Sequence, residues 1–143
     1  MVCEPKLRGV AGHYRGSTGF GKAFINAGDR EWAGKMHDDL IDAVNWAIAE
    51  GIADPKRIAI CGASYGGFAS FVGATLTPDV FCCSVPIVGV TNLETMLANP
   101  PPYWASFYEE ECHRIGDPPP KRAGPCSRRA RRFIGSATSP SPC

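Results

Sequence analysis

The stretch IAICGASYGG, residues 58–67, decides how this chain folds. Residues 57–61 form a short apolar run bounded by turn residues, which is typical of a strand buried in a parallel sheet. Residues 62–67 predict a tight corner, and the small apolar residues from Phe68 to Leu76 predict a helix. Residues 82–88 predict the next buried strand. The order of strand, helix and strand indicates an α/β sheet with a crossover connection.

A second pattern precedes this stretch and predicts a helix from about residue 31 to residue 50. Its apolar side chains recur every fourth residue, at Trp32, Met36, Leu40, Val44 and Ile48. Asp29 is expected to cap the N-terminus of this helix, and Gly51 to follow its C-terminus. Residues 10–14 are expected to end a strand, whereas the chain after Val90 is expected to form loops.

The corner at residues 62–67 contains Gly62-x-Ser64-x-Gly66, the motif of a hydrolase nucleophile. In this motif the serine occupies a strained turn between a strand and a helix, so that its hydroxyl projects from the carboxyl end of the sheet. Side chains two residues away on either side would clash, which explains Gly62 and Gly66. The N–H of Tyr65 would be one donor of an oxyanion hole. The alternative is a glycine-rich turn of a nucleotide-binding or structural α/β domain.

Charge and composition divide the chain into two parts. Residues 1–117 hold nine Lys or Arg against 14 Asp or Glu, a net charge of −5, whereas residues 118–143 hold six Lys or Arg and no acid. The second part also has six prolines, with only Phe133 and Ile134 as large apolar residues. We therefore expect residues 118–143 to be a disordered basic tail rich in Pro, Arg and Ser, distinct from residues 1–117.

The seven cysteines do not form a recognisable framework, since their number is odd and Cys-x-x-Cys never occurs. Neither disulfides nor a zinc site is expected, and nothing in the sequence calls for another metal or a cofactor. The N-terminus has no apolar signal region, and no stretch approaches 18 apolar residues. A cytoplasmic protein without a membrane partner is expected.

Several short motifs follow one another along the chain in a characteristic order. They are YRGSTGFG (14–21), AGDREW (27–32), KM-x-DDL (35–40), GIADPKR (51–57), GASYGG (62–67), VGVTNL (88–93) and IGD (115–117). In this order and spacing they resemble the catalytic domain of the prolyl oligopeptidase family, over about residues 13–117 and closest to its acylaminoacyl-peptidase and dipeptidyl-peptidase-like branch. The resemblance implies that residues 1–117 form an incomplete catalytic domain, a partial α/β-hydrolase with a mostly parallel sheet and flanking helices, truncated at both ends.

By this resemblance Ser64 would be the acylating nucleophile of a serine peptidase that cleaves short peptides. The triad of this fold runs Ser, Asp, His, and the family places the acid about 80 residues after the serine and the histidine about 30 beyond it. Only 79 residues follow Ser64, so the triad Asp and His are expected to be absent from this chain. His113 and Asp117 stand in the wrong order and only four residues apart. The chain is expected to be a truncated or frame-shifted fragment, inactive on its own.

Two alternatives stay open beside the peptidase. A carboxylesterase of the same fold would share the serine motif. A non-enzymatic fragment could bind nucleic acid through its basic tail, but the tail lacks interleaved aromatic residues, so no nucleic-acid partner is expected. The sequence does not indicate an oligomeric state.

Five residues near the motifs carry milder expectations. Arg15 is expected to organise backbone near the site. Asp38 and Asp39 are expected to lie on a solvated or locally bonded helix face. His13 and His37 are expected to be structural or surface residues.

Overall fold

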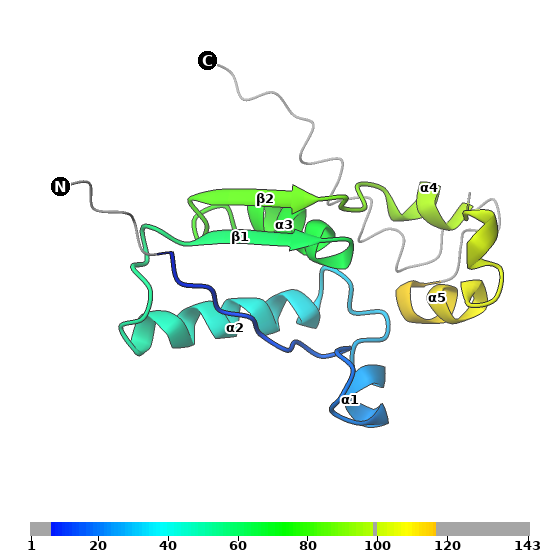
Figure 1. Cartoon of the computed structure of the whole chain (residues 1–143), viewed down its shortest axis with the longest axis horizontal. Helices are drawn as coiled ribbons and strands as arrows, with labels where there is room; N and C mark the ends of the chain where they lie inside the picture. Colours follow the sequence, from blue (N-terminus) through cyan, green and yellow to red (C-terminus); the bar gives the residue numbers. More distant parts are fainter. Residues whose placement is uncertain (1–6, 99, 117–143) are drawn as a thin grey trace, which may run out of the picture.

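The structure is a computed structural model that describes residues 7–98 and 100–116. The basic tail predicted for residues 118–143 lies outside the described residues. In the described residues, five helical elements lie around a central unit made of two strands and the helix between them (Figure 1). In chain order the elements are α1 (Lys22–Asn26), α2 (Lys35–Ala49), β1 (Ala59–Ala63), α3 (Tyr65–Leu76), β2 (Cys83–Ile87), α4 (Leu93–Ala98), the 3₁₀ helix η1 (Pro102–Trp104) and α5 (Tyr108–Ile115).

The two strands form a parallel pair, in which Cys61 of β1 lies opposite Val85 of β2. α3 connects them and packs against both strands, and α2 contacts α3 and runs below β1 in the view of Figure 1. The predicted order of strand, helix and strand in an α/β sheet is therefore confirmed. α3 begins at Tyr65, three residues earlier than expected, because the chain enters the helix directly from the corner.

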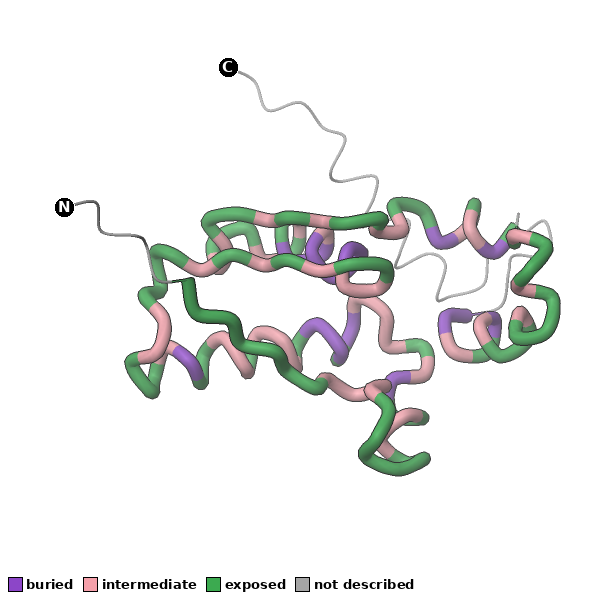
Figure 2. Tube along the Cα trace, viewed as in Figure 1, coloured by how far each residue is buried: buried purple, intermediate pink, exposed green. Residues whose placement is uncertain are grey.

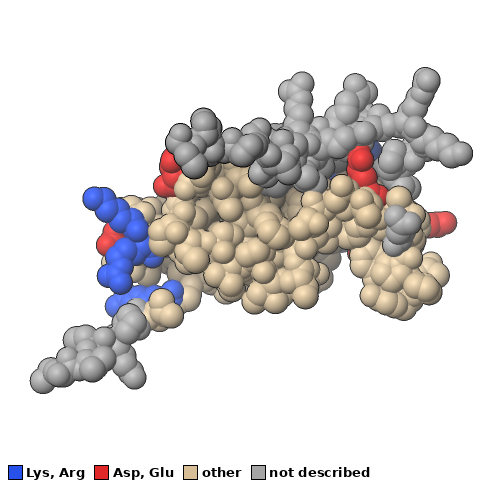
Figure 3. All heavy atoms as spheres, turned by 90° about the horizontal axis from the view of Figure 1, so that it is seen from above, with Lys and Arg blue, Asp and Glu red and all other residues tan. Residues whose placement is uncertain are grey.

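The sheet is covered on one face only within the described residues (Figure 2). Alternate residues such as Ile60 and Ser84 are half-buried toward α3, while Val85 and Ile87 are 43% and 48% exposed on the other face. Seen from above in Figure 3, the visible Lys and Arg gather mostly at one end and the visible acids lie toward both ends, while the middle of the described surface is uncharged. The expectation that both strands are buried was wrong here, because an apolar run shows that a strand suits burial but does not supply the covering element.

Residues 10–14 form no strand, contrary to expectation. Instead the chain passes along α2, where a side chain at Gly12 would lie 3.7 Å from the Ala43 Cβ (Figure 1). Glycine interrupts the apolar run here, and β1 pairs with β2 but with no segment before it in the described part of the chain. A strand without a partner leaves its backbone groups unpaired, so this segment stays irregular.

α2 begins at Lys35 rather than near residue 31, and Asp29 does not cap it. The chain before it turns sharply, since Arg30 and Ala33 adopt positive φ angles of 62° and 57°. The Glu31 carboxylate accepts the Lys35 N–H at 2.9 Å and so satisfies one free donor at the start of the helix. At the other end Gly51 has a φ of 68°, so the prediction of glycine after the C-terminus is confirmed.

The chain after Val90 forms two short α-helices and the 3₁₀ helix η1, so the expectation of loops was wrong. α4 and α5 have only six and eight residues, and such short helices are marginal unless they pack against something. The Tyr108 hydroxyl donates to the Leu97 carbonyl and joins the two helices. One sequence signal was available, because α5 carries acids in its first turn and His113 and Arg114 in its last, as the helix dipole favours.

The buried apolar core joins α3 to these two helices. Its members come from α3, α4 and α5 alone, so α3 packs against the sheet on one side and against this later segment on another. They are Phe68, Val72, Leu93, Leu97, Cys112 and Ile115.

α5 is also tied to the segment before α2. The Arg30 N–H donates to the Arg114 carbonyl at 2.6 Å, and the Arg114 guanidinium contacts the Asp29 carboxylate at 3.1 Å. Asp29, expected as a helix cap, therefore serves as a partner for a residue far along the chain.

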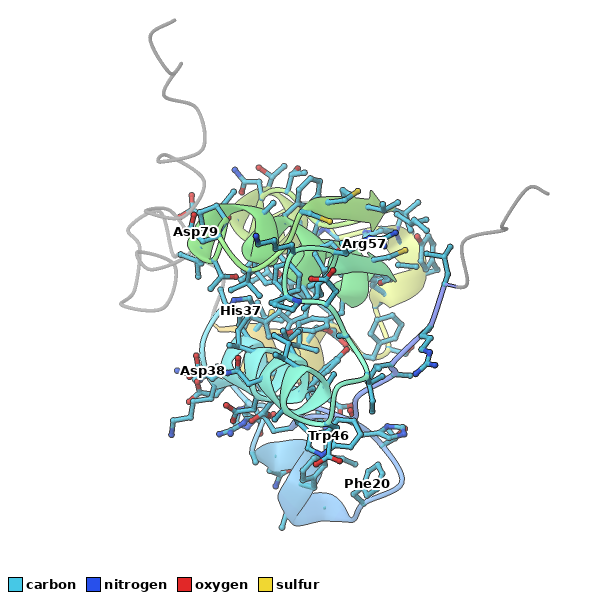
Figure 4. The ribbon with its side chains drawn as sticks, turned by 90° about the vertical axis from the view of Figure 1, so that its left-hand side faces the viewer. Phe20, His37, Asp38, Trp46, Arg57 and Asp79 are labelled. Carbon is cyan, nitrogen blue, oxygen red and sulfur yellow. The ribbon has the colours of Figure 1, made fainter. Side chains whose placement is uncertain are left out.

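His37 connects α2 to the end of α3 and is only 6% exposed (Figure 4). Its Nε2 lies 3.1 Å from the Thr77 hydroxyl oxygen, and that hydroxyl donates to the Gly73 carbonyl. His37 Nε2–H is therefore the donor to Thr77, and Nδ1 is the unprotonated nitrogen. Nδ1 is buried without a hydrogen-bond partner among the described residues. Burial lowers the pKa of His37, which the neighbouring Asp38 carboxylate only partly opposes.

We expect the stability of the fold to fall in acid because of His37. The unfolded chain binds a proton at the ordinary pKa of 6.5, whereas the folded state holds His37 neutral to lower pH. The stabilisation is thus complete above this value and is lost as the pH falls toward the folded pKa. Urea unfolding between about pH 5 and pH 8 should show a steeper acid loss for the parent than for His37→Gln.

His13→Gln is the matched control, since His13 is exposed and its ring packs against Phe20. It should keep the acid dependence of the parent. Parallel stability curves for the parent and His37→Gln would contradict the role assigned to His37.

Candidate active site

Ser64 stands at the junction between β1 and α3, as the motif predicted. Its φ of 55° and ψ of −114° place it in a region that residues with side chains rarely adopt. Such a conformation costs about 1–3 kcal/mol and persists only where the surroundings impose it. The Ser64 N–H donates to the Ile87 carbonyl at 3.0 Å, which holds the corner at the carboxyl ends of both strands. The residue itself is exposed.

The two glycines of the motif have different steric roles. A Cβ at Gly62 would lie 2.6 Å from the Gly66 carbonyl carbon, so a side chain is excluded there, as expected. A Cβ at Gly66 would meet nothing within 4 Å, so the clash expected at this position is absent among the described residues. The contact is one-sided. A Cβ at Gly62 would point at the Gly66 backbone, whereas a Cβ at Gly66 would point away from Gly62.

A second glycine pair, which sequence reasoning missed, holds the start of α3 against the turn after β2. A Cβ at Gly67 would lie 2.6 Å from the Gly89 Cα, and one at Gly89 would lie 2.6 Å from the Gly67 carbonyl carbon. The available signal was Gly67 itself, because a glycine within a helical pattern usually has a packing reason. Val88, between this turn and β2, has a φ of 45° and is 82% exposed.

Tyr65 follows Ser64 and anchors the start of α3 through its ring. The ring centroid lies 4.6 Å from that of Trp32 in an edge-on contact, 5.2 Å from that of Tyr14 and 5.9 Å from that of Phe68. We call these four residues the aromatic cluster. Burial raises the pKa of the Tyr65 hydroxyl far above its ordinary value, with smaller contributions from Tyr14 and Asp39.

The Tyr65 backbone N–H, for which the sequence predicts an oxyanion-donor role, lies at the N-terminus of α3. Tyr65 is the first residue of α3, and the first N–H groups of a helix have no acceptor within it. Ser64, Tyr65, Gly62 and Gly66 are thus all brought together at one corner.

Asp39 does not lie on a solvated or locally bonded face, contrary to expectation. Its Oδ2 accepts the Arg15 backbone N–H at 2.9 Å and Nε at 2.8 Å, and its Oδ1 accepts Nη2 at 2.6 Å. These hydrogen bonds from Arg15 lower the pKa of Asp39. Asp38 is exposed, as expected.

The three histidines have contacts away from Ser64. His13 packs against Phe20 with a centroid distance of 4.8 Å, His37 contacts Thr77, and His113 lies 3.7 Å from Asp29. Asp117 lies outside the described residues. Within the described ranges, no three His, Cys, Asp or Glu side chains gather as a metal site, and no helix has the length and apolarity of a membrane span.

Comparison with known proteins decides the family. Residues 9–123 match the prolyl oligopeptidase family. The chain belongs to this family. The resemblance drawn from the sequence motifs is therefore confirmed.

Named relatives and a solved structure agree with this assignment. The chain is 60% identical over 106 residues to dipeptidyl aminopeptidase BIII of Pseudoxanthomonas mexicana, covering 74% of this chain and 15% of that protein. It is 33% identical over 104 residues to an acylamino-acid-releasing enzyme of Arabidopsis thaliana, covering 71% and 14%. A puromycin-hydrolysing peptidase of Mycobacterium tuberculosis has a TM-score of 0.69 and 29% identity, with 84% of this chain and 17% of that chain covered.

These matches confirm the predicted fold class, a partial α/β-hydrolase with a parallel sheet and flanking helices. The chain spans less than a fifth of the length of each of these three proteins.

The two motif glycines should respond differently to substitution. Gly62→Ala should lower the free energy of unfolding by about 1–3 kcal/mol, because the added Cβ overlaps the backbone of α3. Gly66→Ala should change it by less than about 1 kcal/mol and in the stabilising direction, because alanine favours the helix. Urea unfolding followed by circular dichroism measures both. Equal losses would contradict the one-sided contact and would point to a neighbour of Gly66 outside the described residues.

Proposed function

We propose that Ser64 is the acylating nucleophile of a serine peptidase that hydrolyses short peptides near their N-termini. The observation that carries this proposal is the strained backbone of Ser64 at the β1–α3 junction, in a chain of the prolyl oligopeptidase family. Strained backbone conformations of this kind are concentrated at functional sites. The named relatives are a dipeptidyl aminopeptidase and an acylamino-acid-releasing enzyme, which favours a peptide substrate over a simple ester.

The chemistry at this corner would begin with attack of the Ser64 Oγ on the peptide carbonyl carbon. The carbonyl oxygen gains negative charge as the new bond forms, and the Tyr65 N–H would donate a hydrogen bond to it. A general base takes the proton of the Ser64 hydroxyl and gives it to the nitrogen of the breaking C–N bond, so the amine departs neutral and leaves an acyl ester on Ser64. Water then hydrolyses this ester, which releases the acid and restores the hydroxyl. Exposure of Ser64 allows a substrate to approach.

The general base and its acid partner are the groups that the described residues do not supply. The three histidines lie in other contacts, so we propose that both groups come from outside residues 7–116. A serine peptidase without its base loses up to about 10⁶-fold in rate, so the 143-residue chain alone should turn over substrate very weakly. Location in the cytoplasm stays a prediction.

A chimera tests the proposal directly. Residues 9–116 of this chain would replace the matching segment of the Pseudoxanthomonas mexicana relative, which supplies the rest of a catalytic domain. We expect the chimera to hydrolyse a dipeptidyl amide and to bind a fluorophosphonate probe at Ser64. Ser64→Ala should abolish both, with a loss of at least about 10³-fold in kcat.

Ser106→Ala is the control, because Ser106 is an exposed serine outside the motif. It should keep full activity and labelling. Retained hydrolysis in Ser64→Ala would contradict the role of Ser64. Hydrolysis of acyl esters without hydrolysis of dipeptidyl amides would favour the carboxylesterase instead.

A further inference from the structure

We propose that Arg15 and Asp39 are a positioning pair, which holds the loop of residues 14–17 against Tyr65 and so orients the Tyr65 N–H beside Ser64. The inference rests on the proposed role of Ser64. It concerns two residues that do not touch the substrate and act through a third.

The contact between the two residues is unusually complete for an ion pair near the surface. Both Asp39 oxygens are engaged, one by the Arg15 N–H and Nε and the other by Nη2, at 2.6 to 2.9 Å. The two side chains are only 29% and 23% exposed. A two-pronged, partly buried pair is stronger and more directional than an exposed one. It connects α2 to a segment 24 residues earlier in the chain.

The loop that carries Arg15 is itself closely held. The Ser17 N–H and hydroxyl both donate to the Tyr14 carbonyl, at 3.1 and 2.6 Å, and the Gly16 N–H donates to the Phe24 carbonyl at 2.9 Å. A Cβ at Gly28 would lie 2.7 Å from the Gly16 Cα, so the loop rests on the backbone of Gly28. The loop therefore moves as a unit, and Asp39 determines where that unit sits relative to α2.

Tyr14 connects the loop to the candidate active site through its contact with Tyr65. Its ring lies beside that of Tyr65, while Trp32 meets the Tyr65 ring edge-on and Phe68 packs as its third neighbour. A shift of the loop would remove one of the three neighbours of Tyr65. Since Tyr65 directly follows Ser64, a change in its ring would alter the direction of the N–H that the reaction uses. A displacement of about 1 Å of a group that contacts the reacting atoms can reduce the rate about 100-fold.

The three hydrogen bonds also predict an order among variants. Asp39→Asn removes the charge and disturbs all three hydrogen bonds, whereas Arg15→Ala removes two and leaves the backbone N–H of residue 15 bonded to Asp39. Asp39→Asn should therefore have the larger effect. Asp38→Asn is the matched control, because Asp38 is the exposed neighbour on the same helix (Figure 4).

Hydrogen exchange in the 143-residue chain tests the structural part of the proposal without any activity. In Asp39→Asn, the hydrogen-bonded amides of residues 15–17 should exchange at least about tenfold faster, because charge-assisted hydrogen bonds are lost. The Phe68 amide, which donates to the Ser64 carbonyl across the turn that holds Tyr65, should also exchange faster. Arg15→Ala should show a smaller increase, and Asp38→Asn none. Unchanged exchange of the Phe68 amide in both Asp39→Asn and Arg15→Ala would overturn the proposal.

Fluorophosphonate labelling of the chimera tests the positioning itself. Asp39→Asn should lower the maximal labelling rate about 10- to 100-fold while the half-saturating probe concentration changes less than about twofold, because the N–H acts on the transition state. Faster exchange with an unchanged labelling rate would overturn the proposal and leave a purely structural pair. A parent chimera without labelling would contradict the role of Ser64 instead, and the exchange data would still show whether the pair holds Tyr65.

Discussion

The close contact between the backbone of α3 and the ends of the two strands is the constraint on which the rest of the structure depends. Gly62 meets Gly66, Gly67 meets Gly89, and the Ser64 N–H is bonded to the end of β2. No side chain fits between these backbones, so the helix must leave the sheet through a sharp corner. That corner forces the unusual φ of Ser64 and also exposes it. Strain and accessibility are two results of the same packing.

The surroundings of this corner are organised by the first two turns of α3. The Tyr65 ring packs against Tyr14 and Trp32, which precede α2 in the chain. Phe68 also contacts Trp32 and belongs to the core formed with α4 and α5. Segments from both sides of the strand–helix–strand unit therefore converge beside Ser64. Asp39 belongs to this arrangement because it fixes the loop that carries Tyr14. The corner therefore depends on several distant segments as well as on its own short motif.

The elements that were predicted well are those that depend on neighbouring residues. The strand, the corner and α3 follow from an apolar run, glycines and small residues that lie together in the sequence, and Gly51 ends α2 as expected. α4 and α5 were missed because helices this short form only against a core. The strand at residues 10–14 was wrong because a strand requires a partner, and the start of α2 was displaced because Arg30 and Ala33 turn the chain.

The sequence by itself determined the nucleophile motif, the family and the strand–helix–strand order, because each follows from residues within a few positions of one another or from motifs in a defined order. Only the tertiary structure decided that Gly62, unlike Gly66, excludes a side chain, that Gly67 meets Gly89, and that the partner of Asp39 is Arg15. These are contacts between segments far apart in the chain. Their geometry depends on how whole elements pack, which no local pattern of residues records.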